Sequence, residues 1–234
     1  MRIHHCLLSL ALLLCSACNW FPSPPEHYLV HPKVHFIFWG ATWNAADYEV
    51  RWTRLLAAAP GTPAVLDRLA EYGNTGATFV GPAYQPADVP VDTTPGAQLL
   101  DATIDATLED YFRTGQVPAP SGEDVYVVFL PTGTTTVLSA TTGAIGYHTA
   151  SFSANAWYAI AVVTDRGTND ITLSHELYES ITDPYGTGWH NGPHKEEVAD
   201  MCEPGKPTYV APGYEIWGDT WVSHVWSAAQ GKCL

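Results

Sequence analysis

The chain has 234 residues, of which 24 are acidic and 10 are basic, and its formal net charge is −14 at pH 7. A surface this acidic repels phosphate backbones, so we exclude nucleic acid as a partner, and Lys and Arg are too few for a basic membrane-binding patch. Hydrophobic residues make up 46% of the chain and aromatic residues 12%, which excludes a disordered chain. Length and composition therefore predict one globular domain with a full core, which we expect to be a monomer.

The first 18 residues have the order of features of a secretion signal. Arg2 gives a basic start, residues 7–14 form an apolar run, and small residues follow. The run is shorter than the roughly 20 residues that a membrane-spanning helix needs. We therefore expect an exported protein, with residues 19–30 as a Pro-rich spacer and residues 31–234 as the working domain.

The segment Cys15-Ser16-Ala17-Cys18 is similar to a bacterial lipobox, in which the last cysteine becomes the lipidated first residue. The resemblance implies that a lipid on Cys18 is the protein's attachment to a membrane. The usual Leu is displaced by one position, and Cys15 stands where it is expected. The alternative is cleavage by an ordinary signal peptidase, which would leave the protein secreted and Cys18 without a role.

Four apolar runs predict strands, and four segments with helical spacing of apolar residues predict helices. In chain order these are a strand at 34–40, helices at 46–58 and 62–72, a strand at 77–80, a helix at 96–114, strands at 124–130 and 156–163, and a helix at 171–183. A loop is expected at 132–136, and an irregular tail follows the last helix. This order indicates an α+β or α/β fold; we take it as a single α+β domain, in which a mixed sheet is followed by a site-bearing helix.

The helix at 171–183 carries the residues with the clearest chemistry. Its apolar stripe is centred on Leu177, and His175 and Glu179 lie on the opposite stripe. Because these two residues are one turn apart, they can bind one ion, for which we expect zinc. Glu176 points about 100° away from His175, close enough to act as a general base on a water without being a ligand. The alternative is a surface helix with ordinary charges.

A third ligand has to come from outside His175 and Glu179. Asp183 continues their stripe, but it lies about 12 Å along the axis from His175, so we expect it to support the site rather than share the ion. Glu197 and Asp200 lie on one face of a predicted helical turn at 196–202. We expect Glu197 to be the ligand and Asp200 to orient the site, with the reverse assignment open.

Three other histidines are candidates for the same site. His190 and His194 lie in the loop that follows the helix, within reach of the ion; the alternative is that they are solvated loop residues. His148 lies just before the strand at 156–163, and we expect it to contact substrate or transition state. The alternative is a structural histidine.

Cys202 and Cys233 are the two cysteines left after removal of the signal and lipidation of Cys18. In an oxidising compartment they are expected to form a disulfide. The alternative is two unrelated buried thiols.

The pattern His175-Glu176-x-x-Glu179 resembles the His-Glu-x-x-His motif of zincin metallopeptidases, in which two histidines bind zinc and the glutamate is the general base. Glu179 stands in place of the second histidine; it adds negative charge and should make a bound water less acidic. Glu197, with Asp200 nearby, is similar to the arrangement in gluzincins, where a Glu farther along the chain is the third ligand and an Asp orients a ligand histidine.

The segments Ser174–Asp183, Gly188–Trp189, Glu197–Cys202 and Trp226–Cys233 also resemble a group of secreted bacterial proteins, and more remotely the phosphate-induced, EXORDIUM-like cell-wall proteins of plants. The resemblance covers mainly residues 146–234 and implies a zincin-like domain.

From residues and resemblance together, we expect an exported zinc-dependent hydrolase, a metallopeptidase that acts on a peptide or protein substrate. The alternative is a non-catalytic cell-surface or cell-wall binding protein. In that protein the same residues would hold a structural metal, and calcium would suit their carboxylates.

Overall fold

The computed structural model describes residues 28–40, 43–56, 64–86, 98–131, 133–164, 169–191, 196–210, 213–217 and 220–234, without the side chains of residues 54, 55 and 169. The expected secretion signal, the lipidation site at Cys18 and the candidate His194 lie outside these residues. No helix in the described ranges is both long and apolar enough to cross a membrane.

A five-stranded mixed sheet forms the centre of the molecule, with the strand order β2-β1-β4-β7-β6. Its strands are β1 (Lys33–Phe38), β2 (Thr78–Phe79), β4 (Asp124–Phe129), β6 (Gly146–Ser153) and β7 (Ala156–Val163). The first four strands in the sheet order are parallel to one another, and β6 is antiparallel to β7 along its whole length. The expected mixed sheet is confirmed.

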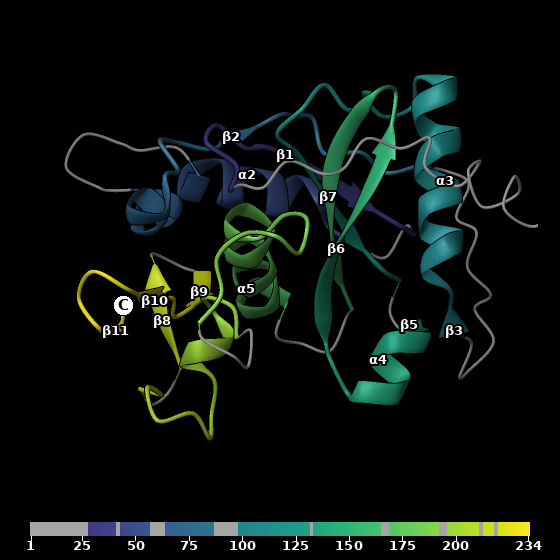
Figure 1. Ribbon diagram of the computed structural model, residues 1–234. Helices are drawn as coiled ribbons and strands as arrows, with labels where there is room; N and C mark the ends of the chain where they lie inside the picture. The colour runs from purple at the N-terminus through teal and green to yellow at the C-terminus, as the bar shows by residue number, and fades with distance from the viewer. Residues whose placement is uncertain are drawn as a thin grey trace, which may run out of the picture.

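Helices cover both faces of this sheet (Figure 1). They are α2 (Ala45–Leu56), the 3₁₀ helix η1 (Val65–Tyr72) and α5 (Asn169–Thr182) on one face, and α3 (Asp101–Thr114) on the other. Alternation along the strands divides the core accordingly: Val127 packs on the α5 face and Val128 on the α3 face. Because the central strands are buried on both faces, they read as continuous apolar runs.

The helices expected at 46–58 and 171–183 form as α2 and α5, and the strands expected at 34–40, 77–80, 124–130 and 156–163 form as β1, β2, β4 and β7. The described part of 62–72 is a 3₁₀ helix, and α3 begins at Asp101 because Gln98–Leu99 form a short strand, β3. β3 pairs with β5 (Thr135–Thr136), in the expected loop. A short helix, α4 (Val137–Thr142), follows, and the Thr136 hydroxyl caps it by accepting a hydrogen bond from Ser139 N at 3.0 Å.

The tail after α5 is more regular than expected. It holds the 3₁₀ turn η3 (Asp200–Cys202), an antiparallel hairpin of β8 (Tyr214–Trp217) and β9 (Thr220–Ser223), and a second pair of β10 (Trp226–Ser227) and β11 (Lys232–Cys233). The hairpin packs against α5, where Ser223 N donates a hydrogen bond to the Ser174 hydroxyl at 2.7 Å. The tail is therefore held beside the helix that carries the candidate site (Figure 1).

Candidate metal centre

Helix α5 is anchored at its first turn and along its apolar face. Asp170 accepts hydrogen bonds from the Arg51 guanidinium at 2.6 Å and from Trp52 Nε1 at 3.1 Å. Leu173, Leu177 and Ile181 are fully buried in the core between α5 and the sheet. With this face fixed, the helical period directs His175 and Glu179 toward the cavity beside β6.

The first cluster of possible ligands consists of His175, Glu179 and Asp200. His175 Nε2 lies 3.2 Å from Glu179 Oε1 and 3.5 Å from Asp200 Oδ1. Ligand atoms about 2.1 Å from a tetrahedral zinc ion lie about 3.4 Å from one another. These distances and the nitrogen and oxygen donors therefore fit one zinc ion. We call this group the His175 cluster.

The geometry favours the reverse of the expected roles for Glu197 and Asp200. Asp200 joins His175 and Glu179, and its backbone N–H also donates to Glu179 Oε1 at 3.2 Å. Glu197 instead lies beside His148, with Glu197 Oε1 3.3 Å from His148 Nε2. The roles differ because Glu197 precedes the short turn η3, so that the two residues do not share one face of a helix.

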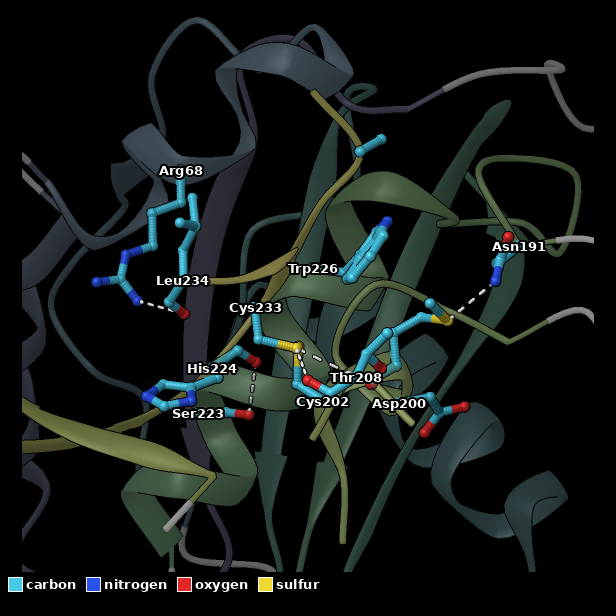
Figure 2. The surroundings of a disulfide bond; sticks show 12 residues. Arg68, Asn191, Asp200, Cys202, Thr208, Ser223, His224, Trp226, Cys233 and Leu234 are labelled. Atoms are coloured by element: carbon cyan, nitrogen blue, oxygen red, sulfur yellow. Dashed lines mark hydrogen bonds between the residues drawn. A yellow bond between two sulfur atoms is a disulfide. The ribbon is translucent and has the colours of Figure 1, made fainter. Parts of the chain in front are cut away.

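Asp200 is held next to the two cysteines of the tail. Cys202 and Cys233 lie at disulfide distance, with their sulfur atoms 2.11 Å and their Cα atoms 5.9 Å apart. Figure 2 shows Asp200 beside this pair, with its carboxylate directed away from the sulfur atoms. A disulfide between them would tie the position of Asp200 to the end of the chain.

His148 lies in a second cluster, which β6 and α5 form together. Its Nδ1 lies 3.8 Å from Glu176 Oε2 and 3.7 Å from Glu179 Oε2. Its Nε2 lies 3.2 Å from the carbonyl oxygen of Asp183, and on the same side as Glu197. His148 is paired with Ala161 of β7, so the alternation of β6 directs it toward α5. We call His148, Glu176 and Glu179 the His148 cluster.

A glycine lets β6 and α5 approach this closely. A Cβ atom on Gly146 would lie 2.5 Å from Thr172 Cγ2 and 2.7 Å from Glu176 Oε1. Glu176 thus occupies the space that any other residue at position 146 would fill. The sequence gives little sign of this role, because the signal is only the lack of a side chain where two elements touch.

The cavity over both clusters has a volume of about 640 Å³. Its described lining includes five carboxylates and two histidines, but neither Lys nor Arg; the carboxylates belong to Glu176, Glu179, Glu197, Asp200 and Glu203. Glu203 lies outside any motif, so its sequence position gives no sign that it lines this cavity. A group of five carboxylates, of which Glu176 and Glu179 are buried, with so few positive partners fits a site for a divalent cation.

The electrostatics of the site follow from burial and from this excess of acids. Burial opposes a charged imidazole, but the neighbouring carboxylates outweigh it and raise the pKa of both His148 and His175 well above the ordinary value. Burial raises the pKa of Glu176 and of Glu197. Burial also opposes ionisation of Glu179, but the two histidines outweigh it and lower its pKa.

Asp183 and His190 shape the loop below the site rather than joining either cluster. Asp183 Oδ1 accepts a hydrogen bond from Gly188 N at 2.5 Å, and its Oδ2 lies 3.2 Å from His190 Nδ1. The Asp183 carbonyl in turn contacts His148. His190 is therefore engaged by Asp183 and not by the two clusters.

The assignment of chemistry to this centre depends on these contacts. The resemblances to zincins and to the EXORDIUM-like proteins stay expectations. In comparisons with known proteins, no family model, no curated protein and no solved structure matches this chain.

Proposed function

We propose that this protein is an exported, metal-dependent hydrolase that cleaves peptide bonds. The observation that carries the proposal is the His175 cluster, whose ligand atoms have the spacing of a tetrahedral site, with the buried carboxylate of Glu176 next to it. A divalent cation held there, for which zinc is the best match, would polarise a substrate carbonyl and activate a water.

Glu176 has the position and environment of a general base. It is 5% exposed, and burial raises its pKa toward the range in which a carboxylate both takes and returns a proton. In the proposed reaction the water oxygen bonds to the carbonyl carbon, and Glu176 takes the proton of that water. The C–N bond then breaks, and Glu176 delivers the proton to the leaving nitrogen.

The edge strand β6 supports a peptide as the substrate. Within the described sheet β6 pairs only with β7, so no described strand lies along its other edge, and an extended chain could pair there. The segment 142–148 forms one wall of the cavity, with His148 inside it. A peptide that paired with this edge would cross the cavity beside Glu176.

The rival function is a non-catalytic exported domain that holds calcium. Five carboxylates around the cavity favour it, because calcium prefers oxygen ligands. The intact Glu176 favours the hydrolase, because metal binding in the His175 cluster does not require this residue. Export itself, and a lipid anchor on Cys18, remain part of the proposal.

The test combines metal analysis with cleavage of a peptide mixture. The exported full chain, freed of metal with a chelator and reloaded with zinc, is expected to bind the metal and to release new peptide ends that mass spectrometry detects. Glu176→Gln is expected to keep the ion of the His175 cluster and to lose roughly 10²–10⁴-fold in cleavage rate. His175→Ala is expected to lose both that ion and cleavage.

Glu196→Gln is the matched control. Glu196 neighbours the site in sequence but pairs with Lys206 at 2.5 Å, away from both clusters. It should change neither the metal content nor the rate. A chain that binds no metal after loading would refute the centre, and unchanged cleavage by Glu176→Gln would refute the base. A calcium-loaded chain that cleaves no peptide would establish the rival.

A further inference from the structure

We infer that the centre binds two divalent cations, one in the His175 cluster and a second in the His148 cluster, with the Glu179 carboxylate bridging them. The inference deepens the proposed function, on which it rests for the first ion, and it gives Glu176 two roles: Oε2 would contact the second ion and Oε1 would take the proton. The residues that would hold the second ion come from two elements, His148 from β6 and the two glutamates from α5.

The tautomer of His148 gives the first argument. The carbonyl oxygen of Asp183 can only accept a hydrogen bond, so His148 Nε2, 3.2 Å away, must carry the hydrogen that it donates. Glu197 Oε1 is a second acceptor on the same side, at 3.3 Å. In a neutral imidazole this leaves the lone pair on Nδ1, which faces the carboxylates of Glu176 and Glu179. A positive species is therefore required between these three groups.

The distances favour a metal ion over a proton as that species. A charge-assisted hydrogen bond from an imidazolium to a carboxylate spans about 2.7–2.9 Å, but Nδ1 lies 3.8 Å and 3.7 Å from the nearest oxygens of Glu176 and Glu179. Ligands that share a cation with bonds of about 2.1–2.5 Å lie roughly 3.4–4 Å apart. The spacing of the His148 cluster falls in this range.

Glu179 faces both clusters with different oxygens. Its Oε1 lies 3.2 Å from His175 Nε2, and its Oε2 lies 3.7 Å from His148 Nδ1. A carboxylate that presents one oxygen to each ion is suited to two-metal sites, whose ions lie about 3.5–4 Å apart. Its side chain is 4% exposed, so water does not compete for either oxygen.

Glu176 gives the independent observation. Its Oε2 is buried and has no hydrogen-bond partner among the described residues, and the side chain is 6% exposed. A buried carboxylate oxygen that accepts no hydrogen bond is unfavourable unless a cation contacts it closely. His148 also has the surroundings of a metal-binding histidine. Its Nε2, on the side away from the cluster, contacts the Glu197 carboxylate and the Asp183 carbonyl, as the second nitrogen of a ligand histidine usually does.

Metal stoichiometry tests the inference without reference to activity. The exported full chain, stripped with a chelator, is titrated with Zn²⁺ and separately with Mn²⁺, and bound metal per chain is measured after desalting. Two ions per chain are expected, and paired Mn²⁺ ions should give an exchange-coupled electron paramagnetic resonance spectrum. His148→Gln should bind one ion and lose the coupled spectrum. Glu197→Ala should weaken the second ion by about 10–100-fold, because His148 loses an orienting acceptor.

His190→Gln is the control histidine, since His190 contacts Asp183 outside both clusters and should leave two ions bound. Saturation of the wild type at one ion, with an uncoupled Mn²⁺ spectrum, overturns the inference and makes His148 a charged structural partner; the wild-type measurement decides this even if His148→Gln fails to fold. Two bound ions without peptide cleavage would support the second site while the proposed hydrolase fails. One bound ion with peptide cleavage would support the hydrolase and overturn the second site.

Discussion

Two buried histidine–carboxylate groups lie on opposite faces of the sheet, and they differ in how closely the partners approach. On the α3 face, His35 Nε2 contacts Asp124 Oδ1 at 2.8 Å, and both residues are 2% exposed. Asp124 Oδ2 accepts from Ser121 N at 2.8 Å and from the Ser121 hydroxyl at 3.2 Å. On the α5 face, the histidine–carboxylate distances of the two clusters range from 3.2 to 3.8 Å.

The difference teaches how to distinguish a structural pair from a site. At the closed pair, both carboxylate oxygens of Asp124 are satisfied within the protein, and His35 stacks on Tyr126 with ring centres 4.6 Å apart. At the open clusters, the acids outnumber the histidines and Glu176 Oε2 has no partner within the described residues. A histidine nitrogen within hydrogen-bond distance of a carboxylate oxygen stabilises the fold. Longer distances between the same groups leave room for a cation between them.

The largest expected effect on stability comes from removing Asp124 from its pair with His35. Asp124→Ala leaves His35 Nε2 unpaired in a buried place and removes the acceptor of Ser121 N, and it should lower the free energy of unfolding by about 3–5 kcal/mol. Urea unfolding at pH 7 measures it, and Asp110→Asn at an exposed pair with Arg113 should change stability by less than about 0.5 kcal/mol. Bound metal per chain should stay unchanged in Asp124→Ala, and its loss would contradict the separation of the two regions.

The same pair predicts a pH dependence. Burial disfavours the Asp124 carboxylate, but the hydrogen bonds from His35 and Ser121 outweigh it and lower the pKa of Asp124. Its contribution to stability is therefore complete above the unfolded pKa of about 3.9 and is lost as pH falls through the lower folded pKa. The stability difference between wild type and Asp124→Ala should stay constant from pH 7 to about 5 and narrow below about 4.

The next largest effect concerns the tail that positions Asp200. Cys202 and Cys233 are 31 residues apart, so a disulfide between them should stabilise the fold by about 3–4 kcal/mol through chain entropy. The double change Cys202→Ser and Cys233→Ser should remove this stabilisation. It should also weaken metal binding at the His175 cluster, because Asp200 lies two residues from Cys202. Thermal unfolding and zinc titration measure the two effects. Free thiols at both positions in the exported protein would contradict the prediction that a disulfide stabilises the tail.

The smallest expected effect is stabilisation by metal. Zinc at 100 times its dissociation constant should raise the free energy of unfolding by about 2.7 kcal/mol per independent site. The double variant His148→Ala and His175→Ala should lose this increment, whereas Asp124→Ala should keep it. A zinc effect that survives the double histidine variant would place the cation elsewhere.

Much of the architecture could be predicted because the signals are local. The runs at 124–130 and 156–163 are apolar without interruption, as strands buried on both faces must be, and they form β4 and β7. The edge strand β6 was not predicted, since its sequence mixes small, polar and aromatic residues, most of them half-buried, without a clear alternation. The sequence before it is typical of a turn, so β5 and α4 were not predicted either. β5 depends on pairing with β3, and α4 depends on the Thr136 cap.

The sequence by itself determined the contact of His175 with Glu179, because residues four apart on a helix face the same way whatever the rest of the fold does. It also determined the two buried strands and, by count, the two cysteines of the tail. Only the tertiary structure decided that Asp200 completes the His175 cluster, that His148 turns toward Glu176, and that His35 pairs with Asp124, 89 residues away. These contacts depend on strand order, on the face to which an edge strand directs its side chains and on the path of the tail, and sequence spacing carries none of these.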